Sequence, residues 1–242
     1  MTLHVISSSS RGNSYALQSD TETLFIEAGI RLSSVKKSLN YDLRTPVGCI
    51  CSHSHGDHFK YAADFVKLCP IYAPAQAINH AKLGCGMGVQ PVKEGNTFTV
   101  GAFRITPFEV YHDVPCFGYV IYHKQMGTML FATDTFALPY EFQNINHWLI
   151  EANYDDAILT GNLNQGKIDR KQYNRVLTSH MSLQNCISNL RQGNAENAHT
   201  ITLIHLSSRH SHPDGFQNKV AAEFGCPTYI ATKGVKVNLT KL

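Results

Sequence analysis

The sequence predicts an α/β protein folded as a four-layer αββα sandwich, with two mixed β-sheets packed face to face and helices on the outer faces. Two observations favour this fold. Predicted strands alternate with predicted helices through two comparable halves, 1–111 and 118–242. In addition, several short apolar strands end in His, Asp or Glu, so these polar groups are expected along one edge of the packed sheets.

The composition fits one globular domain over residues 1–242, because 43% hydrophobic residues at this length can form a substantial core. The net charge of +3 is compatible with a phosphorylated substrate without indicating one. Seven cysteines, an odd number without a Cys-x-x-Cys pair, favour reduced thiols and a cytoplasmic location. The N-terminus lacks a signal-like pattern, and no apolar run reaches the ~18 residues of a membrane span. We therefore expect a soluble protein with no membrane partner.

The first half begins with a strand at 3–6 and a hairpin formed by 15–19 and 24–27. The intervening loop, 7–14, is rich in hydroxyl groups and contains a Gly-Asn turn signal. One interpretation is a simple turn. The other is a loop at the mouth of a site, whose hydroxyl and N–H groups contact phosphate oxygens. On the second interpretation the substrate-binding residues are Ser8, Ser10, Asn13 and Ser14.

The rest of this half combines short strands with amphipathic helices. In order, the sequence predicts a helix at 31–39, a buried strand at 47–51, a helix at 59–68, a strand at 71–73, a helix at 75–82, and a hairpin of 97–100 and 103–108. Residues 84–88 form a glycine-rich connection. Cys85 in this connection is expected to be a plain loop residue rather than a reactive thiol.

The loop after strand 47–51 concentrates four potential metal ligands, His53, His55, Asp57 and His58. The two-residue step between His53 and His55 lets both rings converge on one ion. Asp57 and His58 point elsewhere and could hold a second ion. Imidazole and carboxylate together suit zinc, manganese or iron, with zinc the default choice. A solvated polar loop is the alternative, but three histidines within six residues argue against it.

The second half of the chain also alternates between predicted strands and predicted helices. In order, the sequence predicts a hairpin of 118–123 and 128–132, a strand at 148–153, a partly helical segment at 155–179, a helix at 183–191, a strand at 200–204, a helix at 213–224, and strands at 228–230 and 235–239. Ser182 is a suitable N-cap for the helix that follows it. The partly helical segment is the most basic part of the chain, through Lys167, Arg170, Lys171 and Arg175. A solvated helix face is one interpretation of these charges, and the sequence does not define another.

The run from His53 to His58 resembles the His-x-His-x-Asp-His signature of the metallo-β-lactamase superfamily. The resemblance covers nearly the whole chain and implies three further ligands at strand ends, which are His112, Asp134 and His205. It also implies two divalent ions. One would be held by His53, His55, His112 and Asp134, and the other by Asp57, His58, Asp134 and His205. The two oxygens of Asp134 could bridge cations ~3.5–4 Å apart.

Residues outside the first loop indicate which branch of the superfamily the chain resembles. The strand-end Glu151 and the pre-helical His180 look like a Glu–His pair of the phosphodiesterase branch that includes ribonuclease Z. The chain also resembles the bacterial YycJ-type nucleases and their phage relatives. Glu27 stands where the family usually has Asp, and the resemblance implies that it orients a metal-bound His from behind. His210 and His212 lie outside the family pattern and are expected on the surface.

The resemblance and the chemistry together imply a dinuclear-metal phosphodiesterase or nuclease. A metal-bridging hydroxide would attack the phosphate, and His180, kept protonated by Glu151, would protonate the leaving oxygen. The expected catalytic residues are Asp57, Glu151 and His180. Because the chain has no long insertion to grip tRNA, tRNA 3′ processing is not expected.

Other functions remain open at this stage. They are a small cyclic-nucleotide phosphodiesterase, a thioester or lactone hydrolase on the same metals, and a binding or structural protein that retains an ion site without turnover. The expected partner is a phosphodiester, either nucleic acid or a small nucleotide. The sequence allows a homodimer but does not predict an oligomeric state.

Overall fold

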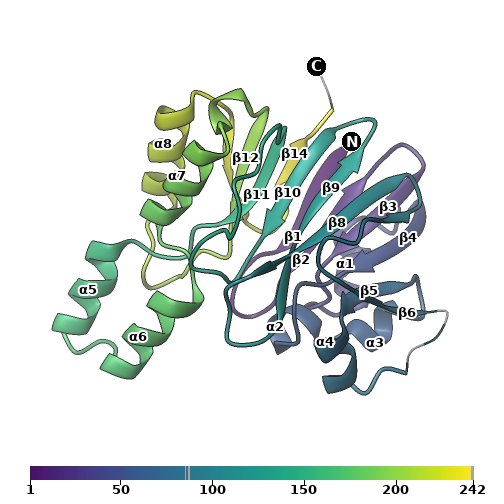
Figure 1. Ribbon diagram of the computed structural model, residues 1–242, viewed down its shortest axis with the longest axis horizontal. Coiled ribbons are helices and arrows are strands. Elements are labelled where there is room, and N and C mark those ends of the chain that lie inside the picture. The colour runs from purple at the N-terminus through teal and green to yellow at the C-terminus, as the bar shows by residue number, and fades with distance from the viewer. Residues whose placement is uncertain (85, 87, 241–242) are drawn as a thin grey trace.

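The computed structural model describes residues 1–84, 86 and 88–240, and these form four layers. Two seven-stranded sheets pack face to face, and helices lie on the outer face of each (Figure 1). The expected αββα sandwich with two mixed sheets is therefore confirmed. Cys85 lies outside the described residues.

The N-terminal part of the chain and one C-terminal strand form the first sheet. In spatial order its strands are β14 (Lys236–Asn238), β1 (Thr2–Ser7), β2 (Ser14–Gln18), β3 (Glu22–Ile26), β4 (Thr45–Ile50), β5 (Ile71–Pro74) and β6 (Val89–Val92). Strands β3 to β6 are parallel to one another, whereas β14, β1, β2 and β3 pair antiparallel. The C-terminal ends of β3 and β4 consequently lie side by side.

The second sheet follows the same plan. In spatial order its strands are β13 (Thr228–Ile230), β12 (Thr200–Ile204), β11 (His147–Glu151), β10 (Gly127–Ala132), β9 (Cys116–His123), β8 (Phe103–Val110) and β7 (Phe98–Val100). Strands β10 to β13 are parallel, and β7 to β10 pair antiparallel. Because β8 runs in the same direction as β10, β11 and β12, all four strands end at one edge of this sheet.

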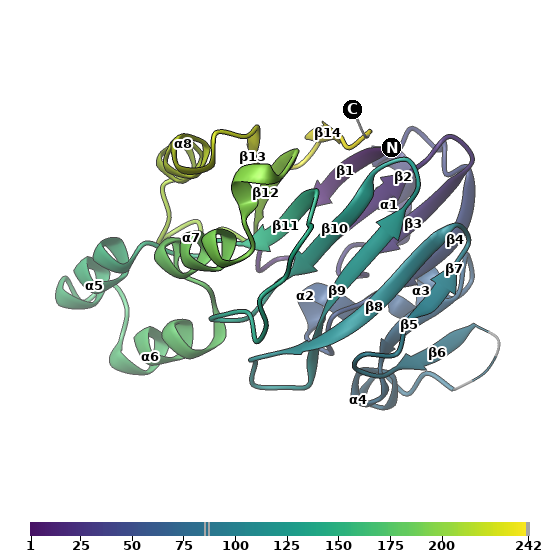
Figure 2. The ribbon, with the colours of Figure 1, turned by 45° about the horizontal axis from the view of Figure 1, so that its top comes forward.

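Apolar side chains fill three layers between the sheets and helices. The central layer lies between the two sheets, where the rings of Tyr15 and Phe131 meet edge to face with centroids 6.2 Å apart. The outer layers form where α1, α3 and α4 cover the first sheet and where α7 and α8 cover the second (Figure 2). The strands are thus buried on both faces, which explains their short, nearly continuous apolar sequences.

The helices are short, and most lie against a sheet. They are α1 (Leu32–Ser38), α2 (Gly56–Phe59), α3 (Ala62–Phe65), α4 (Ala75–His80), α5 (Asp156–Asn164), α6 (Arg170–Ser179), α7 (Leu183–Gln192) and α8 (Pro213–Phe224), with a 3₁₀ turn at Ala195–Asn197. The exception is the pair α5 and α6, a helical hairpin that projects from the sandwich beside the ends of β11 and β12 (Figures 1 and 2). None of the helices in the described ranges has the length and apolar character needed to span a membrane.

Three local predictions need correction. The division into halves at 111 and 118 is wrong, because β7 and β8 pair with the second sheet and β14 returns to the first. The helix expected at 59–68 is instead two short helices, α2 and α3. The break occurs because the N–H of Tyr61 donates to the carbonyl of Ala28, 2.9 Å away, rather than to the preceding turn. Strand β6 was not predicted from the sequence.

Candidate metal centre

The candidate ligands gather at the edge of the sandwich where the parallel strands end. His53 follows β4, His112 follows β8, Asp134 follows β10 and His205 follows β12. Asp57 and His58 lie in α2, the first turn of helix after the loop that leaves β4. Residues from both sheets meet here because the packed strands deliver their C-terminal ends to one place.

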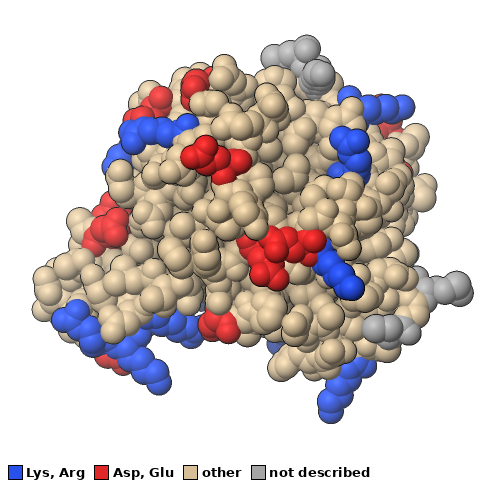
Figure 3. Space-filling view, viewed as in Figure 1, with Lys and Arg blue, Asp and Glu red and all other residues tan. Residues whose placement is uncertain are grey.

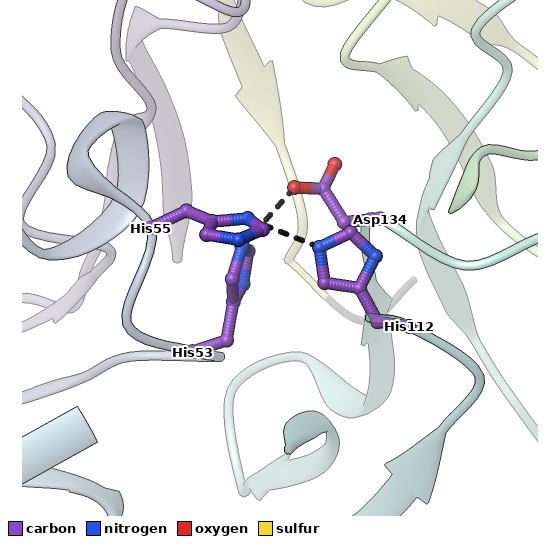
Figure 4. A group of neighbouring side chains, drawn as sticks. All are labelled: His53, His55, His112 and Asp134. Atoms are coloured by element: carbon purple, nitrogen blue, oxygen red, sulfur yellow. Dashed lines mark hydrogen bonds and ion pairs between the residues drawn. The ribbon is translucent and has the colours of Figure 1, made fainter. Parts of the chain in front are cut away.

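The first cluster contains His53, His55, His112 and Asp134, whose potential ligand atoms all lie within 4.8 Å of one another. Figure 4 shows the three imidazole rings and the carboxylate turned toward a common centre. Nε2 of His112 lies 3.1 Å from Nδ1 of His55, and Nε2 of His53 lies 3.4 Å from Oδ2 of Asp134. The structure thus brings together the four residues that the resemblance assigned to one ion.

The second cluster contains Asp57, His58, Asp134 and His205. Nε2 of His58 lies 2.9 Å from Oδ2 of Asp134, and Nδ1 of His205 lies 2.8 Å from Oδ1 of the same carboxylate. Oδ2 of Asp57 lies 3.3 Å from Nε2 of His58. Asp134 therefore belongs to both clusters, as a bridging carboxylate would.

The chemistry of the two clusters fits divalent cations. Nε2 of His53 and Nε2 of His205 are buried and have no hydrogen-bond partner among the described residues. Buried polar atoms without partners are costly, and a cation at each cluster would give them one. Five imidazoles and two carboxylates are the donor set that zinc, manganese and iron accept.

Three residues at this edge adopt the left-handed backbone conformation, which is uncommon for residues other than glycine. Their φ angles are 68° at Glu27, 50° at Asp134 and 55° at His205. Glu27 and His205 come directly after β3 and β12, and Asp134 lies two residues after β10, so the turn at each strand end redirects the side chain from the sheet into the site. Such strain costs about 1–3 kcal/mol per residue and is concentrated at functional sites.

A third group that could hold an ion contains Asp134, Glu151, His180 and His205 and so shares two residues with the clusters above. Oε1 of Glu151 accepts a hydrogen bond from Nδ1 of His180 at 2.8 Å, and Nδ1 of His205 lies 2.9 Å from the same oxygen. Oε2 of Glu151 accepts from the backbone N–H of Thr135 at 3.0 Å, which fixes the carboxylate. Glu151 is completely buried, whereas the His180 side chain is 19% exposed. His180 is thus positioned by Glu151 and also lies at the surface of the site.

Comparison with known proteins identifies the family. The sequence profile of the beta-lactamase superfamily domain matches residues 31–206, a range that includes every candidate metal ligand. The chain belongs to the beta-lactamase superfamily. The expectation drawn from the His53–His58 run is thereby confirmed.

Individual relatives agree with this assignment. The exodeoxyribonuclease WalJ of Streptococcus pneumoniae is 27% identical over 176 residues, which are 64% of this chain and 63% of WalJ. The chain therefore matches less than two thirds of the length of this curated relative. The metallo-beta-lactamase fold protein YhfI of Bacillus subtilis superposes with a TM-score of 0.75 at 18% identity, covering 98% of this chain and 99% of YhfI. Human tRNase Z, short form, gives 0.63 at 14% identity with complete coverage of both chains. At these identities the two solved structures show the fold alone.

Glu27 lies directly behind this metallo-β-lactamase centre. Its Oε2 is 3.4 Å from Nδ1 of His58, and its Oε1 accepts a hydrogen bond from the backbone N–H of Ser52 at 3.1 Å. The longer side chain, compared with the usual Asp, therefore still reaches the His that it was expected to orient. Close packing holds this region, because a Cβ atom at Gly29 would collide with the carbonyl oxygen of Asp57.

The hydroxyl-rich loop lies at the centre, but its residues differ in position. Ser10 lines a cavity together with His180 and His205. Oγ of Ser8 accepts a hydrogen bond from the backbone N–H of His205 at 2.8 Å. Asn13 and Ser14 are completely buried, and Nδ2 of Asn13 lies 3.0 Å from Nε2 of His58. Ser8 and Asn13 thus brace the candidate ligands, while Ser10 faces the cavity.

The sequence interpretation missed two neighbours of the ligands. Oγ of Ser52 lies 2.8 Å from Nδ1 of His53, which leaves Nε2 of that ring to face the centre. Oδ1 of Asp113 lies 3.1 Å from Nε2 of His112 and 3.5 Å from Nε2 of His55. Both neighbours directly adjoin a candidate ligand in the sequence, and this adjacency could have identified them.

His210 was expected on the surface, and this is wrong. It is only 4% exposed, because its Nδ1 lies 2.9 Å from Nδ2 of Asn162 in α5 and its carbonyl accepts from the N–H of Asp155 at 2.8 Å. His212 is exposed, as expected, and its Nδ1 accepts from the N–H of Gly215 to cap α8. Neither histidine belongs to the clusters described above.

The carboxylates of the centre are strongly acidic. Burial alone would raise the pKa of Asp134, but the adjacent His205 and His58 outweigh it and hold that pKa well below its ordinary value. Burial likewise opposes ionisation of Asp57, while the neighbouring His205 and His58 rings lower its pKa overall. Both carboxylates are therefore ionised at neutral pH, which favours cation binding.

Proposed function

We propose that the protein is a metal-dependent phosphodiesterase of the nuclease type that uses two divalent ions, most simply zinc. The observation that carries this proposal is the position of His180, which Glu151 holds beside both clusters and at the wall of a cavity. A proton donor at this position suits a reaction whose leaving group is a poor alkoxide.

The ions would be held by the two clusters, with Asp134 shared between them. When bound, such ions supply a water-derived nucleophile near neutral pH and neutralise negative charge on a phosphate. The protein contributes the geometry, because the strained backbone at Asp134 and His205 and the buried Glu27 fix the ligands before substrate arrives.

His180 would donate the proton to the leaving oxygen from Nε2. Its Nδ1 is occupied by Oε1 of Glu151, so Nε2 is the nitrogen available to a substrate in the cavity. Burial lowers the pKa of His180, but the charge of Glu151 and its hydrogen bond raise it above the ordinary value overall. This shift favours the protonated imidazole, which is the form that a general acid requires.

Ser10 and Arg11 are the proposed phosphate contacts on the hydroxyl-rich loop, because both line the cavity beside His180. Ser8, Asn13 and Ser14 would instead hold the loop and the ligands in place. The activity of WalJ, an exodeoxyribonuclease, supports a phosphodiester substrate. A thioester or lactone hydrolase has less need of a protonated His180, since its leaving group departs more easily.

A substrate panel tests the proposal. Protein loaded with zinc or manganese is offered single- and double-stranded DNA and RNA, cyclic nucleotides, bis(p-nitrophenyl) phosphate and a thioester. We expect hydrolysis of phosphodiesters, and loss of that activity in Asp134→Ala. Hydrolysis of the thioester without cleavage of any phosphodiester would contradict the proposed function.

A further inference from the structure

A groove leads away from His180 toward the α5–α6 hairpin. Its inner part is a cavity of about 350 Å³ formed by the hydroxyl-rich loop, one face of α6 and the segment after β12. Its outer part is a cavity of about 460 Å³ lined by Asn162, Lys167, Ile168, Arg209 and His210. Arg209 and His210 line both cavities, so the two are neighbours, and we refer to them together as the groove.

The groove is positively charged. Arg11 and Arg209 line the inner cavity and Lys167 lines the outer one, and all three residues are exposed. None of the described residues that line either cavity is Asp or Glu. Over the described ranges, no carboxylate lies within ion-pair distance of these three cations. Figure 3 shows that Lys and Arg side chains also gather along the lower edge of the molecule, over the hairpin. Such a surface attracts a polyanion.

The wall that carries Arg209 is fixed in place. Nδ2 of Asn162 donates a hydrogen bond to the carbonyl of Arg209 at 3.0 Å, and the N–H of Asp155 donates to the carbonyl of His210 at 2.8 Å. Oγ of Ser211 donates to the carbonyl of Ser207 at 2.7 Å and closes the turn that presents Arg209. Because these bonds already exist, a ligand need not order this wall, and less binding energy is lost.

We propose that this groove binds the sugar–phosphate backbone of a polynucleotide strand that runs from the scissile phosphodiester at His180, past Arg209, to Lys167. The inference rests on the proposed function and names its substrate class. A strand presents one phosphate per nucleotide and can meet cations in both cavities. A small cyclic nucleotide carries a single phosphate and leaves the outer cavity without a role.

Lys167→Ala tests the groove, because this residue lines the outer cavity, away from His180. The matched control is Lys37→Ala, which removes an exposed lysine from α1 on the opposite sheet. For the wild type and the control, kcat/KM should rise with the length of single-stranded DNA or RNA oligonucleotides. Lys167→Ala should reduce this rise while hydrolysis of bis(p-nitrophenyl) phosphate stays unchanged.

Binding is measured separately by fluorescence anisotropy with labelled oligonucleotides, using metal-loaded protein carrying His180→Ala to slow cleavage. Loss of one phosphate contact should reduce the slope of log Kd against log salt concentration by about 0.7 for a single strand.

The possible outcomes separate the two ideas. If bis(p-nitrophenyl) phosphate is hydrolysed but kcat/KM does not depend on oligonucleotide length, the groove inference is overturned and the proposed function stands. Identical salt slopes for Lys167→Ala and Lys37→Ala would also overturn the groove inference and leave the proposed function standing. If the metal-loaded wild type hydrolyses no phosphodiester at all, the proposed function is wrong, and the groove inference, which depends on it, is wrong as well.

Discussion

Replacement of His180 should affect substrates according to how readily their leaving groups depart. Nδ1 of His180 is bonded to Glu151 at 2.8 Å and the ring lines the inner cavity. His180 also belongs to the third group that could hold an ion, so His180→Ala removes a proton donor but leaves every residue of the two proposed ion clusters in place. General acid catalysis contributes roughly 10²–10⁴-fold, or about 3–5 kcal/mol of transition-state stabilisation. We expect this loss for an oligonucleotide, and a much smaller loss for bis(p-nitrophenyl) phosphate, because nitrophenolate leaves without a proton.

Glu151→Gln should show a weaker form of the effect expected for His180→Ala. It removes the carboxylate charge beside His180 and keeps a hydrogen-bond acceptor, which costs roughly 1.5 kcal/mol, or about tenfold in rate. Both variants are assayed by steady-state kinetics on the two substrates, with metal content measured in parallel because Glu151 also contacts His205. Equal losses on both substrates would refute the general acid role, and loss of metal from His180→Ala would make His180 a ligand.

Three further predictions concern the surroundings of the centre. Glu27→Gln should weaken metal affinity by about 10–100-fold, because Glu27 supports His58 from behind; an unchanged metal titration would rule this out. Gly29→Ala should lower both thermal stability and metal affinity, because the new methyl group collides with the carbonyl of Asp57; wild-type values for both would contradict the close packing seen here. Burial, followed by the nearby His199, lowers the pKa of His147 to about 4, so the unfolded chain binds more protons than the folded chain between about pH 6.5 and 4, and stability must fall as pH falls. The loss of unfolding free energy from pH 7 to 5, measured with urea, should therefore be about 2 kcal/mol smaller in His147→Gln than in the wild type, and an equal loss in this variant would disprove the assignment.

The sequence was most informative where chemistry and local pattern coincide. Each candidate ligand outside the His53–His58 run lies one or two residues after the end of a strand, and such strands are recognisable from short runs of apolar, β-branched residues. The family resemblance assigned His112, Asp134 and His205 to the same centre as the first loop, and their positions near strand ends agreed with that assignment because neighbouring parallel strands end at the same edge. The pairing of Glu151 with His180 followed from the family resemblance rather than from any local pattern.

Contacts between distant segments explain what the sequence did not reveal. Strand β6 contains Pro91 and lies at the edge of its sheet, and proline normally argues against a strand except at an edge. The burial of His210 depends on Asn162 of α5, far away in the chain. The groove likewise joins Arg11, Lys167 and Arg209 from three separate segments, so no local pattern could show that they share one surface.

Anomalous X-ray diffraction from crystals of the metal-loaded protein tests the two-ion centre most directly. Data collected at the absorption edge of the loaded metal should give two strong peaks per chain. One should lie among His53, His55 and His112, and the other among Asp57, His58 and His205, with Asp134 within bonding distance of both. A single peak, or a peak coordinated by other residues, would contradict a two-ion centre bridged by Asp134.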